Sequence, residues 1–420
     1  MTDALDHAHD LCDFVGASPS PYHAAAELSR RLAGAGFVQQ REVDPWAAGS
    51  GFVVRDGAVI AWRLPADAAP TTPFRIVGAH TDSPTFKLKP RPDLANAGWQ
   101  QLGVEVYGGP LLNSWLDREL GLAGRLVLIS GEHRLVRTEA IMRIPQLAIH
   151  LDRGVNDEGL KLDKQQHLSP VWGVDRRDLR ILSHLAETVG VVADDVAGWD
   201  VVAFDTAAPA IFGTGQEFLA SARLDNLSGV HAGLSALIEA PAAGAITVLA
   251  AFDHEEVGSE TRSGAAGPFL ADVLGRISYA LGAGPDERRR ALAGSVCLSI
   301  DAGHAVHPNY AGRHDPANHP LLGGGPLLKL NANQRYATDA VGAALWRRAC
   351  RTAGVDTQEF VSNNAIPCGS TIGPITATRL GIRTVDVGLP LLSMHSAREL
   401  AGTADPLALA RGAAAFLAGA

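Results

Sequence analysis

Long apolar runs in this chain end abruptly in histidines and acids. Residues 74–79, 246–252 and 296–300 are strings of mostly apolar residues, and ionisable side chains follow each run at once. Such runs, bounded by turn residues, are typical of strands buried in a covered parallel sheet. Ligands of these sheets bind beyond the carboxyl ends of the strands. The pattern therefore predicts an α/β fold with its chemistry concentrated at one edge of a sheet.

The hydrophobic pattern differs between two parts of the chain. Up to about residue 91 and again from 214 onward, buried strands alternate with amphipathic helices, which implies crossovers and a mainly parallel sheet. Residues 92–213 instead carry short β-like runs separated by turn residues. We therefore expect one discontinuous domain, 1–91 and 214–420, interrupted by an inserted β-rich domain, 92–213. The expected helices are 3–16, 21–36, 227–239, 337–353 and 405–418, and the expected strands include 53–54, 59–64, 74–79, 103–107, 124–129, 133–137, 246–252, 296–301 and 382–387.

Composition narrows the class of protein. With 420 residues the chain is too long for one ordinary core, and 19% charged residues against 46% hydrophobic ones suit a protein that hides surface between subunits. The net charge of -9 gives no reason to expect nucleic acid or an anionic membrane as a partner. The four cysteines form no CxxC pair, and no run is long enough to span a bilayer. We expect a soluble, cytoplasmic protein with reduced thiols.

The first two candidate groups each have a plain structural alternative. His80 and Asp82 stand at a strand end and point to the same side, so Asp82 can accept the second ring N–H of His80 and turn a lone pair towards a metal ion. A polar turn after a strand is the alternative. Asp225 stands just before a helix, where it either caps the helix or is shared between two cations.

The next group is harder to explain without a cation. A buried strand runs directly into Asp253-His-Glu-Glu256, and the adjacent carboxylates repel each other unless a positive charge compensates them. A solvated loop is the alternative. In the chemical interpretation, one glutamate binds metal while the other takes a proton from water.

The C-terminal half supplies two further candidates. Asp301 ends a buried strand, with His304 and His307 close behind it, and His395 follows another apolar stretch. A turn acid and a capping histidine are the alternatives for Asp301 and His395. His304 and His307 are ligands by composition alone, and crowding favours a supporting or structural role for them.

Together these residues predict a metal-dependent hydrolase. The candidate ligands are His80, Asp225, Glu256, Asp301 and His395, with a glutamate to spare. The charges of three carboxylates and one bridging hydroxide balance two divalent cations. Zinc accepts this set of nitrogen and oxygen ligands, and Co²⁺ or Mn²⁺ would as well.

Longer motifs surround these residues and follow one another over nearly the whole chain: Gly78-Ala-His-Thr-Asp-Ser-Pro84, Arg223-Leu-Asp-Asn-Leu227, Asp253-His-Glu-Glu-Val-Gly-Ser259, His304-Ala-Val-His-Pro-Asn-Tyr310, Asn331-Ala-Asn-Gln-Arg-Tyr336, Pro367-Cys-Gly-Ser-Thr-Ile-Gly-Pro374 and Met394-His-Ser-Ala-Arg-Glu399. In this order they resemble the motifs of the aspartyl aminopeptidase family. The resemblance implies a two-zinc aminopeptidase on a mainly parallel α/β domain, with the inserted β-rich domain serving dimerisation. It also implies a homo-oligomer, a tetrahedral dodecamer built from dimers, with enclosed active sites.

The resemblance also assigns roles to residues. It implies that one ion binds His80 and Asp301, that the other binds Glu256 and His395, and that Asp225 bridges the two. The remaining implied roles are the catalytic base, Glu255; a histidine that reaches a neighbouring subunit's active site, His167; and a lysine of the substrate pocket, Lys329. Members of the family commonly carry an acidic residue near Ala365, and its absence here argues against a strict preference for N-terminal Asp or Glu.

We therefore expect an exopeptidase that removes the N-terminal residue from unblocked peptides, with a measurable preference for acidic residues. A hydroxide bridging the two metal ions would attack the scissile carbonyl, with Glu255 as general base. One alternative is a related two-metal deacylase or carboxypeptidase, which would require a different free group on the substrate. The other is a non-catalytic, metal-stabilised peptide-binding assembly, although closed structural zinc sites would leave Glu255 without a purpose.

Overall fold

The computed structural model describes residues 2–420, with side chains from Asp3 onward, and they form two compact units. The first unit contains the residues up to Asp82 together with Pro209–Met394 and Glu399–Ala420. The second unit contains Ser83–Ala208 and the short segment His395–Arg398.

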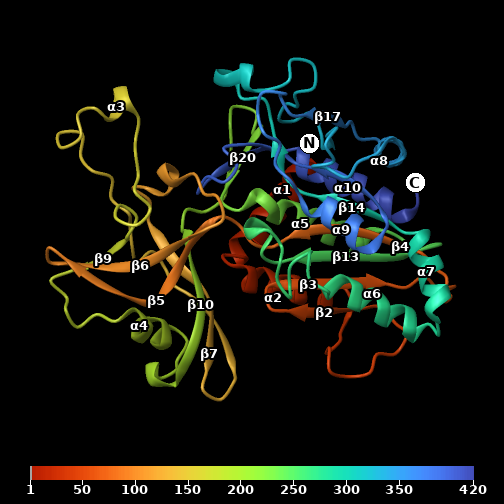
Figure 1. Cartoon of the computed structure of the whole chain (residues 1–420), viewed down its shortest axis with the longest axis horizontal. Helices are drawn as coiled ribbons and strands as arrows, with labels where there is room; N and C mark the ends of the chain where they lie inside the picture. Colours follow the sequence, from red (N-terminus) through yellow and green to blue (C-terminus); the bar gives the residue numbers. More distant parts are fainter. Residues whose placement is uncertain (1) are drawn as a thin grey trace. The chain divides into compact units, whose positions relative to one another are not determined.

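A mixed nine-stranded sheet forms the centre of the first unit (Figure 1). Its neighbouring strands β13, β4, β14 and β18 are parallel, as the alternation of strands and helices predicts, while β3 and β16 join this group antiparallel. The carboxyl ends of the parallel strands therefore meet at one edge. In spatial order the strands are β1 (Val38–Gln39), β2 (Gly51–Arg55), β3 (Ala58–Arg63), β13 (Ile246–Phe252), β4 (Phe74–His80), β14 (Val296–Ile300), β18 (Arg383–Gly388), β16 (Leu327–Leu330) and β17 (Gln358–Val361).

Successive residues of these strands point into two separate cores. In β13, Leu249 packs in one core, whereas Val248 and Phe252 pack in the other. Each fully buried side chain of this size contributes roughly 1.5–3 kcal/mol to folding. The helices of the first core are α1 (Thr2–Ala17), α2 (Pro21–Gly34), α5 (Leu224–Glu239), α8 (Ala340–Ala353) and α10 (Asp405–Ala418), and those of the second are α6 (Phe269–Ala280), α7 (Pro285–Ala293) and α9 (Ile372–Leu380).

Most predicted elements are confirmed, with shifts at their ends that have local causes. The helix expected from residue 337 begins at Ala340, because the Asp339 side chain accepts the Gly342 N–H at 2.6 Å and acts as the N-cap. The helix expected to run to residue 36 ends at Gly34. Helices α6, α7 and α9 and strands β16 and β17 were not predicted.

A smaller sheet in the same unit pairs the segments that follow β14 and β18 with β11, β12 and β20. Its order is β11 (Ala210–Phe212), β12 (Phe218–Ser221), β20 (Glu399–Gly402), β19 (Pro390–Leu392) and β15 (Gly303–His304). Strand β15 follows directly after the end of β14, and β19 follows the end of β18, so this sheet extends the chain beyond the edge where the candidate residues gather.

The second unit is built on an antiparallel sheet with its own core. The sheet order is β8 (His133–Arg137), β7 (Leu120–Leu128), β10 (Val196–Asp205), β5 (Thr85–Asn96), β6 (Trp99–Tyr107) and β9 (Val171–Val174). Two helices, α3 (Val155–Glu158) and α4 (Ile181–Thr188), accompany it. Figure 1 shows α3 on a long irregular segment between β8 and β9. Among residues 2–420, no helix has the length and apolar character needed to cross a membrane. The α/β class and the β-rich character of the insertion are confirmed.

Candidate metal centre

Neighbouring strands deliver most of the predicted site residues to one edge of the central sheet. His80 is the last residue of β4, Asp301 follows β14, and Glu255 and Glu256 follow β13. Because β13, β4 and β14 are adjacent and parallel, these side chains meet. Asp225 reaches the same place from the first turn of α5, where its N–H donates to Glu399 Oε2 at 2.9 Å.

His80, Asp225 and Asp301 form a buried cluster. His80 Nε2 lies 3.3 Å from Asp225 Oδ1 and 3.4 Å from Asp301 Oδ1. One ligand atom from each of the three residues lies within 4.8 Å of the other two, a spacing suited to a metal ion. Burial lowers the pKa of His80, but the hydrogen bonds with Asp225, Asp301 and Asp82 outweigh this and leave the pKa well above its ordinary value. The pocket therefore favours a positive charge at its centre, which is what a divalent cation supplies.

Asp82 orients the residues on both sides of it. His80 Nδ1 lies 3.0 Å from the backbone oxygen of Asp82 and 3.4 Å from its carboxylate Oδ1. The Asp82 carboxylate also accepts the N–H groups of Glu255 and Glu256, at 3.0 and 3.1 Å. A single buried carboxylate thus fixes both the histidine ring and the turn that carries the two glutamates, as residues behind metal ligands do.

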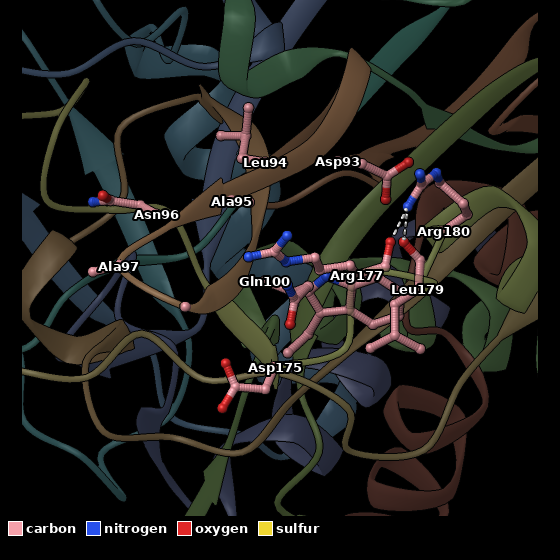
Figure 2. Close-up of a pocket in the computed structure, with 12 residues that line it drawn as sticks. Asp93, Leu94, Ala95, Asn96, Ala97, Gln100, Asp175, Arg177, Leu179 and Arg180 are labelled. Carbon is pink, nitrogen blue, oxygen red and sulfur yellow. Dashed lines mark hydrogen bonds between the residues drawn. The ribbon is translucent and has the colours of Figure 1, made fainter.

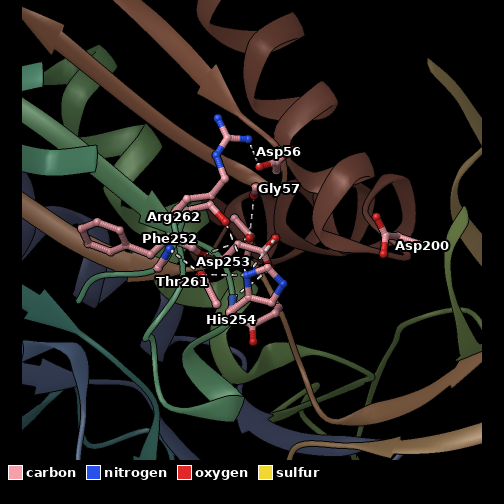
Figure 3. Close-up of polar contacts among 12 residues, drawn as sticks. Asp56, Gly57, Asp200, Phe252, Asp253, His254, Thr261 and Arg262 are labelled. Atoms are coloured by element: carbon pink, nitrogen blue, oxygen red, sulfur yellow. Dashed lines mark hydrogen bonds and ion pairs between the residues drawn. The ribbon is translucent and has the colours of Figure 1, made fainter. Parts of the chain in front are cut away.

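The turn that carries these glutamates is held by polar contacts (Figure 3). His254 has a left-handed backbone with φ 64°; its N–H donates to Asp253 Oδ1 at 2.9 Å, and its Nδ1 lies 3.1 Å from Thr261 Oγ1. Gly57 is required beside it, because an added Cβ would lie 2.5 Å from Asp253 Oδ2. The left-handed backbone of His254, which is not a glycine, is typical of backbone shaped for a functional site.

Glu255 and Glu256 are both partly buried, and one carboxylate oxygen of each lies within 4.8 Å of a His80 ring nitrogen and of the other. Burial raises the pKa of Glu255 to about 7; the His80 charge lowers it, while Asp301, Asp82 and Asp225 raise it. The set of imidazole and carboxylate donors, with its excess of negative charge, fits divalent zinc and chemically similar ions.

Lys329, predicted in the substrate pocket, is buried behind Asp301. It lies on β16 and is 1% exposed. Its Nζ donates to the Ala302 carbonyl at 2.6 Å, lies 3.4 Å from Asp301 Oδ2 and sits 5.3 Å from the centre of the Tyr336 ring. The lysine therefore touches a candidate ligand directly, a contact that the sequence did not indicate.

A cavity of about 280 Å³ in the first unit is lined in part by Tyr336, the residue over whose ring Lys329 lies. Its walls come from four stretches of chain: the one after Asp301, the one around Tyr336, the one from β17 to α9, and residues 391–394. Lining residues include His304, His307, Tyr336, Phe360, Pro367 and Met394.

Two predicted residues belong to the second unit. His167 is exposed, lies between α3 and β9, and its Nδ1 accepts the Asp163 N–H at 3.0 Å. His395, which follows β19 in sequence, has φ 64° and places Nδ1 3.0 Å from the Gly109 carbonyl oxygen. Their roles as a donor to another subunit and as a metal ligand remain predictions.

The second unit contains a cavity of about 530 Å³, larger than the one in the first unit described above (Figure 2). It is lined by the turn between β5 and β6 and by the segment before α4, with Trp172, Arg177 and Arg180 among its residues. None of the predicted site residues lines it.

Comparison with known proteins agrees with this geometry. The family description "Aminopeptidase I zinc metalloprotease (M18)" matches residues 14–416. A relative from Streptomyces avermitilis, named probable M18 family aminopeptidase 2, is 57% identical over 422 residues, covering 98% of each chain.

Among solved structures, the fold is similar to that in the cryo-EM structure of the Ape4 and Nbr1 complex, with a TM-score of 0.95, 34% identity and coverage of 99% of this chain and 86% of the other. It is also similar to the S. cerevisiae mApe1 dodecamer, with a TM-score of 0.87, 28% identity and coverage of 99% and 97%. These matches confirm the resemblance inferred from the motifs: the chain belongs to the M18 family of aminopeptidases, which are zinc metalloproteases.

Proposed function

We propose that this M18 aminopeptidase cleaves the N-terminal residue from unblocked peptides with two metal ions at the edge of its central sheet. The observation that carries the proposal is the convergence of His80, Asp225 and Asp301 with the paired glutamates after β13. His80 and Asp301 would hold one ion and Glu256 and His395 the other, with Asp225 shared. Zinc is the ion that the family description favours, and Co²⁺ or Mn²⁺ suit the same ligands.

The residues around the ions divide the remaining work. Bound divalent ions supply Lewis-acid polarisation of the substrate carbonyl and make water a nucleophile at neutral pH. Glu255 accepts the proton of the attacking water and passes it to the leaving amine, a role worth ~10²–10⁴-fold in rate. Asp82 keeps His80 and the glutamate turn in register, as its contacts with both indicate.

The cavity beside Asp301 is the proposed place for the first side chain of the substrate. The Lys329 ammonium lies over the ring of Tyr336, which lines the cavity, and gives this region a positive charge that favours an acidic side chain. Because its Nζ is already engaged with Asp301 and the Ala302 carbonyl, the preference for N-terminal Asp or Glu should be partial.

The proposed assembly is a homo-oligomer, in which the second unit makes the dimer contacts. The irregular segment between β8 and β9 exposes Leu147, Ile149, Leu151 and Leu160, and apolar groups gathered in one segment are typical of interaction surfaces. By analogy with the mApe1 dodecamer we propose twelve subunits, with His167 donating a hydrogen bond to the substrate carbonyl in a neighbour's site.

A substrate panel tests the reaction. Metal-reconstituted protein is given aminoacyl-anilides with a free amine, the same compounds with a blocked amine, and peptides that differ at the C-terminal residue. We expect release of the first residue only from substrates with a free amine, and loss of turnover after chelation. Equal turnover of blocked substrates would instead identify a deacylase, and release from the C-terminal end a carboxypeptidase.

A further inference from the structure

A buried carboxylate outside the metal centre connects two walls of the cavity beside Asp301. Asp386 lies in the middle of β18 and is fully buried. Its Oδ2 accepts the Ala337 N–H at 2.6 Å, and its Oδ1 accepts the Thr371 hydroxyl at 2.6 Å. Its own N–H lies 2.9 Å from Thr338 Oγ1. One side chain therefore holds both the stretch after Tyr336 and the start of α9.

A glycine at the start of α9 leaves room for the Asp386 carboxylate beside the helix. An added Cβ at Gly373, in the first turn of α9, would lie 2.3 Å from both carboxylate oxygens of Asp386. The Thr371 side chain also caps α9, accepting the Gly373 N–H at 3.2 Å. The carboxylate thus sits against a helix N-terminus, where the exposed amide dipoles favour a negative charge.

The two segments held by Asp386 carry cavity-lining residues. Tyr336 precedes Ala337, while Pro367 and Gly369 precede Thr371, and all three line the cavity. The segments also meet at the side chains of Tyr336 and Cys368: burial, and after it the interaction with Cys368, raises the pKa of Tyr336. Since the Lys329 ammonium lies over the Tyr336 ring, movement of either segment would change the shape and the charge of the cavity together.

We propose that Asp386 is a positioning residue for substrate selectivity: by holding the segments 336–338 and 367–371 together, it sets the shape of the cavity that receives the first side chain of the substrate. This rests on the proposed use of the cavity for that side chain. Asp386 does not touch the reacting atoms. Its removal should therefore change the ranking of substrates more than the rate on a small one.

The test compares variants that remove the contact with variants that keep it. Thr371→Val loses the hydroxyl, Thr371→Ser keeps it, and Asp386→Asn weakens one of the two bonds. For Thr371→Val and Asp386→Asn, the ratio of kcat/KM between aspartyl- and alanyl-anilide should change by at least about fivefold, on the scale of one lost hydrogen bond to a charged group. Thr371→Ser should restore the wild-type ratio.

A matched control separates positioning from general destabilisation. Asp405 is another buried carboxylate at a helix N-terminus, and it accepts the N–H groups of Gly323 and Gly325 at 2.8 and 3.0 Å. Asp405→Asn should lower the unfolding temperature without changing the substrate ratio. If it shifts the ratio as much as Asp386→Asn, or if Thr371→Val leaves the ratio unchanged, the proposal is overturned.

A second measurement does not depend on turnover. Cys368 is half-buried and lies in the segment 367–371, where it interacts with Tyr336 of the other segment. If the two segments separate, its alkylation by iodoacetamide, located by peptide mass spectrometry with Cys12 as reference, should be several-fold faster in Thr371→Val than in wild type or Thr371→Ser. Unchanged labelling would overturn the proposed connection. If the wild-type protein cleaves no anilide, the proposed function is wrong, and the role of Asp386 in selectivity is wrong with it. The labelling of Cys368 would still show whether Asp386 holds the two segments together.

Discussion

At the scale of single residues, the division of labour between Glu255 and Glu256 is the sharpest expectation. Glu255→Gln keeps the shape of the side chain but removes its ability to accept a proton. Turnover should fall by ~10²–10⁴-fold, while metal content measured by mass spectrometry stays at the wild-type level. The exposed Glu260 provides the control, since Glu260→Gln should leave both quantities unchanged. Loss of metal from Glu255→Gln would make this glutamate a ligand.

The proposed bridging of two metal ions by Asp225 predicts a different pattern of metal loss. Because its carboxylate would contact both ions, Asp225→Ala should release both on dialysis. His80→Ala should empty mainly one site and His395→Ala mainly the other. Metal analysis of the three dialysed variants decides the matter. Two tightly held ions in Asp225→Ala would contradict the bridging role.

Lys329 has two interpretations that one substitution distinguishes. Lys329→Met keeps the length of the side chain and removes the charge behind Asp301. If the charge recognises acidic side chains, kcat/KM should fall more for aspartyl- than for leucyl- or alanyl-anilide. Equal losses on all three, accompanied by metal loss, would instead show that Lys329 acts through Asp301.

The residues of the site could be found from the sequence only where a local pattern exposes them. His80, Glu255, Glu256 and Asp301 follow apolar runs, and each lies at the sheet edge that this pattern predicts. The contact of Lys329 with Asp301 depends on β16 joining β18 antiparallel, which no local pattern encodes. Asp386 had a signal of its own, an acid within the apolar stretch Thr384-Val-Asp-Val387, which is costly unless the carboxylate is hydrogen-bonded.

At the scale of elements, prediction followed the strength of periodicity. Helices α5 and α10 have long apolar faces and were predicted within a few residues. Helix α7 is short and rich in Asp, Glu and Arg, and it buries only Ala291, so its sequence looks like a solvated loop. Strands β16 and β17 are too short for a clear alternation, and tertiary pairing decides their structure.

The packing of α1 on α5 should make stability depend on pH. The pKa of His7 is lowered to about 4. Burial is the largest cause and the charge of His231 the next, while Asp10 acts in the opposite direction and Arg411 lowers the pKa. The His7 and His231 rings lie 4.8 Å apart, and His231 Nε2 lies 2.6 Å from Asp10 Oδ2. As the pH falls from about 6.5 to 4, His7 gains a proton in the unfolded chain but not in the folded one. The folded state therefore loses stability over this window, by about 3 kcal/mol at most.

Replacing His7 removes this dependence. His7→Phe keeps an aromatic ring against His231, so its unfolding temperature should fall less than that of wild type between pH 7 and pH 5. His9→Phe, on the exposed face of the same helix, should follow the wild type. Parallel pH profiles for wild type and His7→Phe would show that His7 does not stay neutral when folded.

At the scale of the whole molecule, the proposed assembly makes the activity of one subunit depend on a residue of another. If His167 completes a neighbour's site, a subunit lacking it would keep its metal ions but lose one hydrogen-bond donor to the developing oxyanion, at a cost of ~10²–10³ in kcat. Mixing His167→Ala subunits with Glu255→Gln subunits tests this, because each variant alone should be nearly inactive. Reassembled oligomers would contain some sites that pair an intact Glu255 with the intact His167 of a partner subunit. Those sites should restore part of the activity in proportion to the mixing ratio. No recovery in oligomers verified as mixed would mean that His167 acts within its own subunit or takes no part in the reaction.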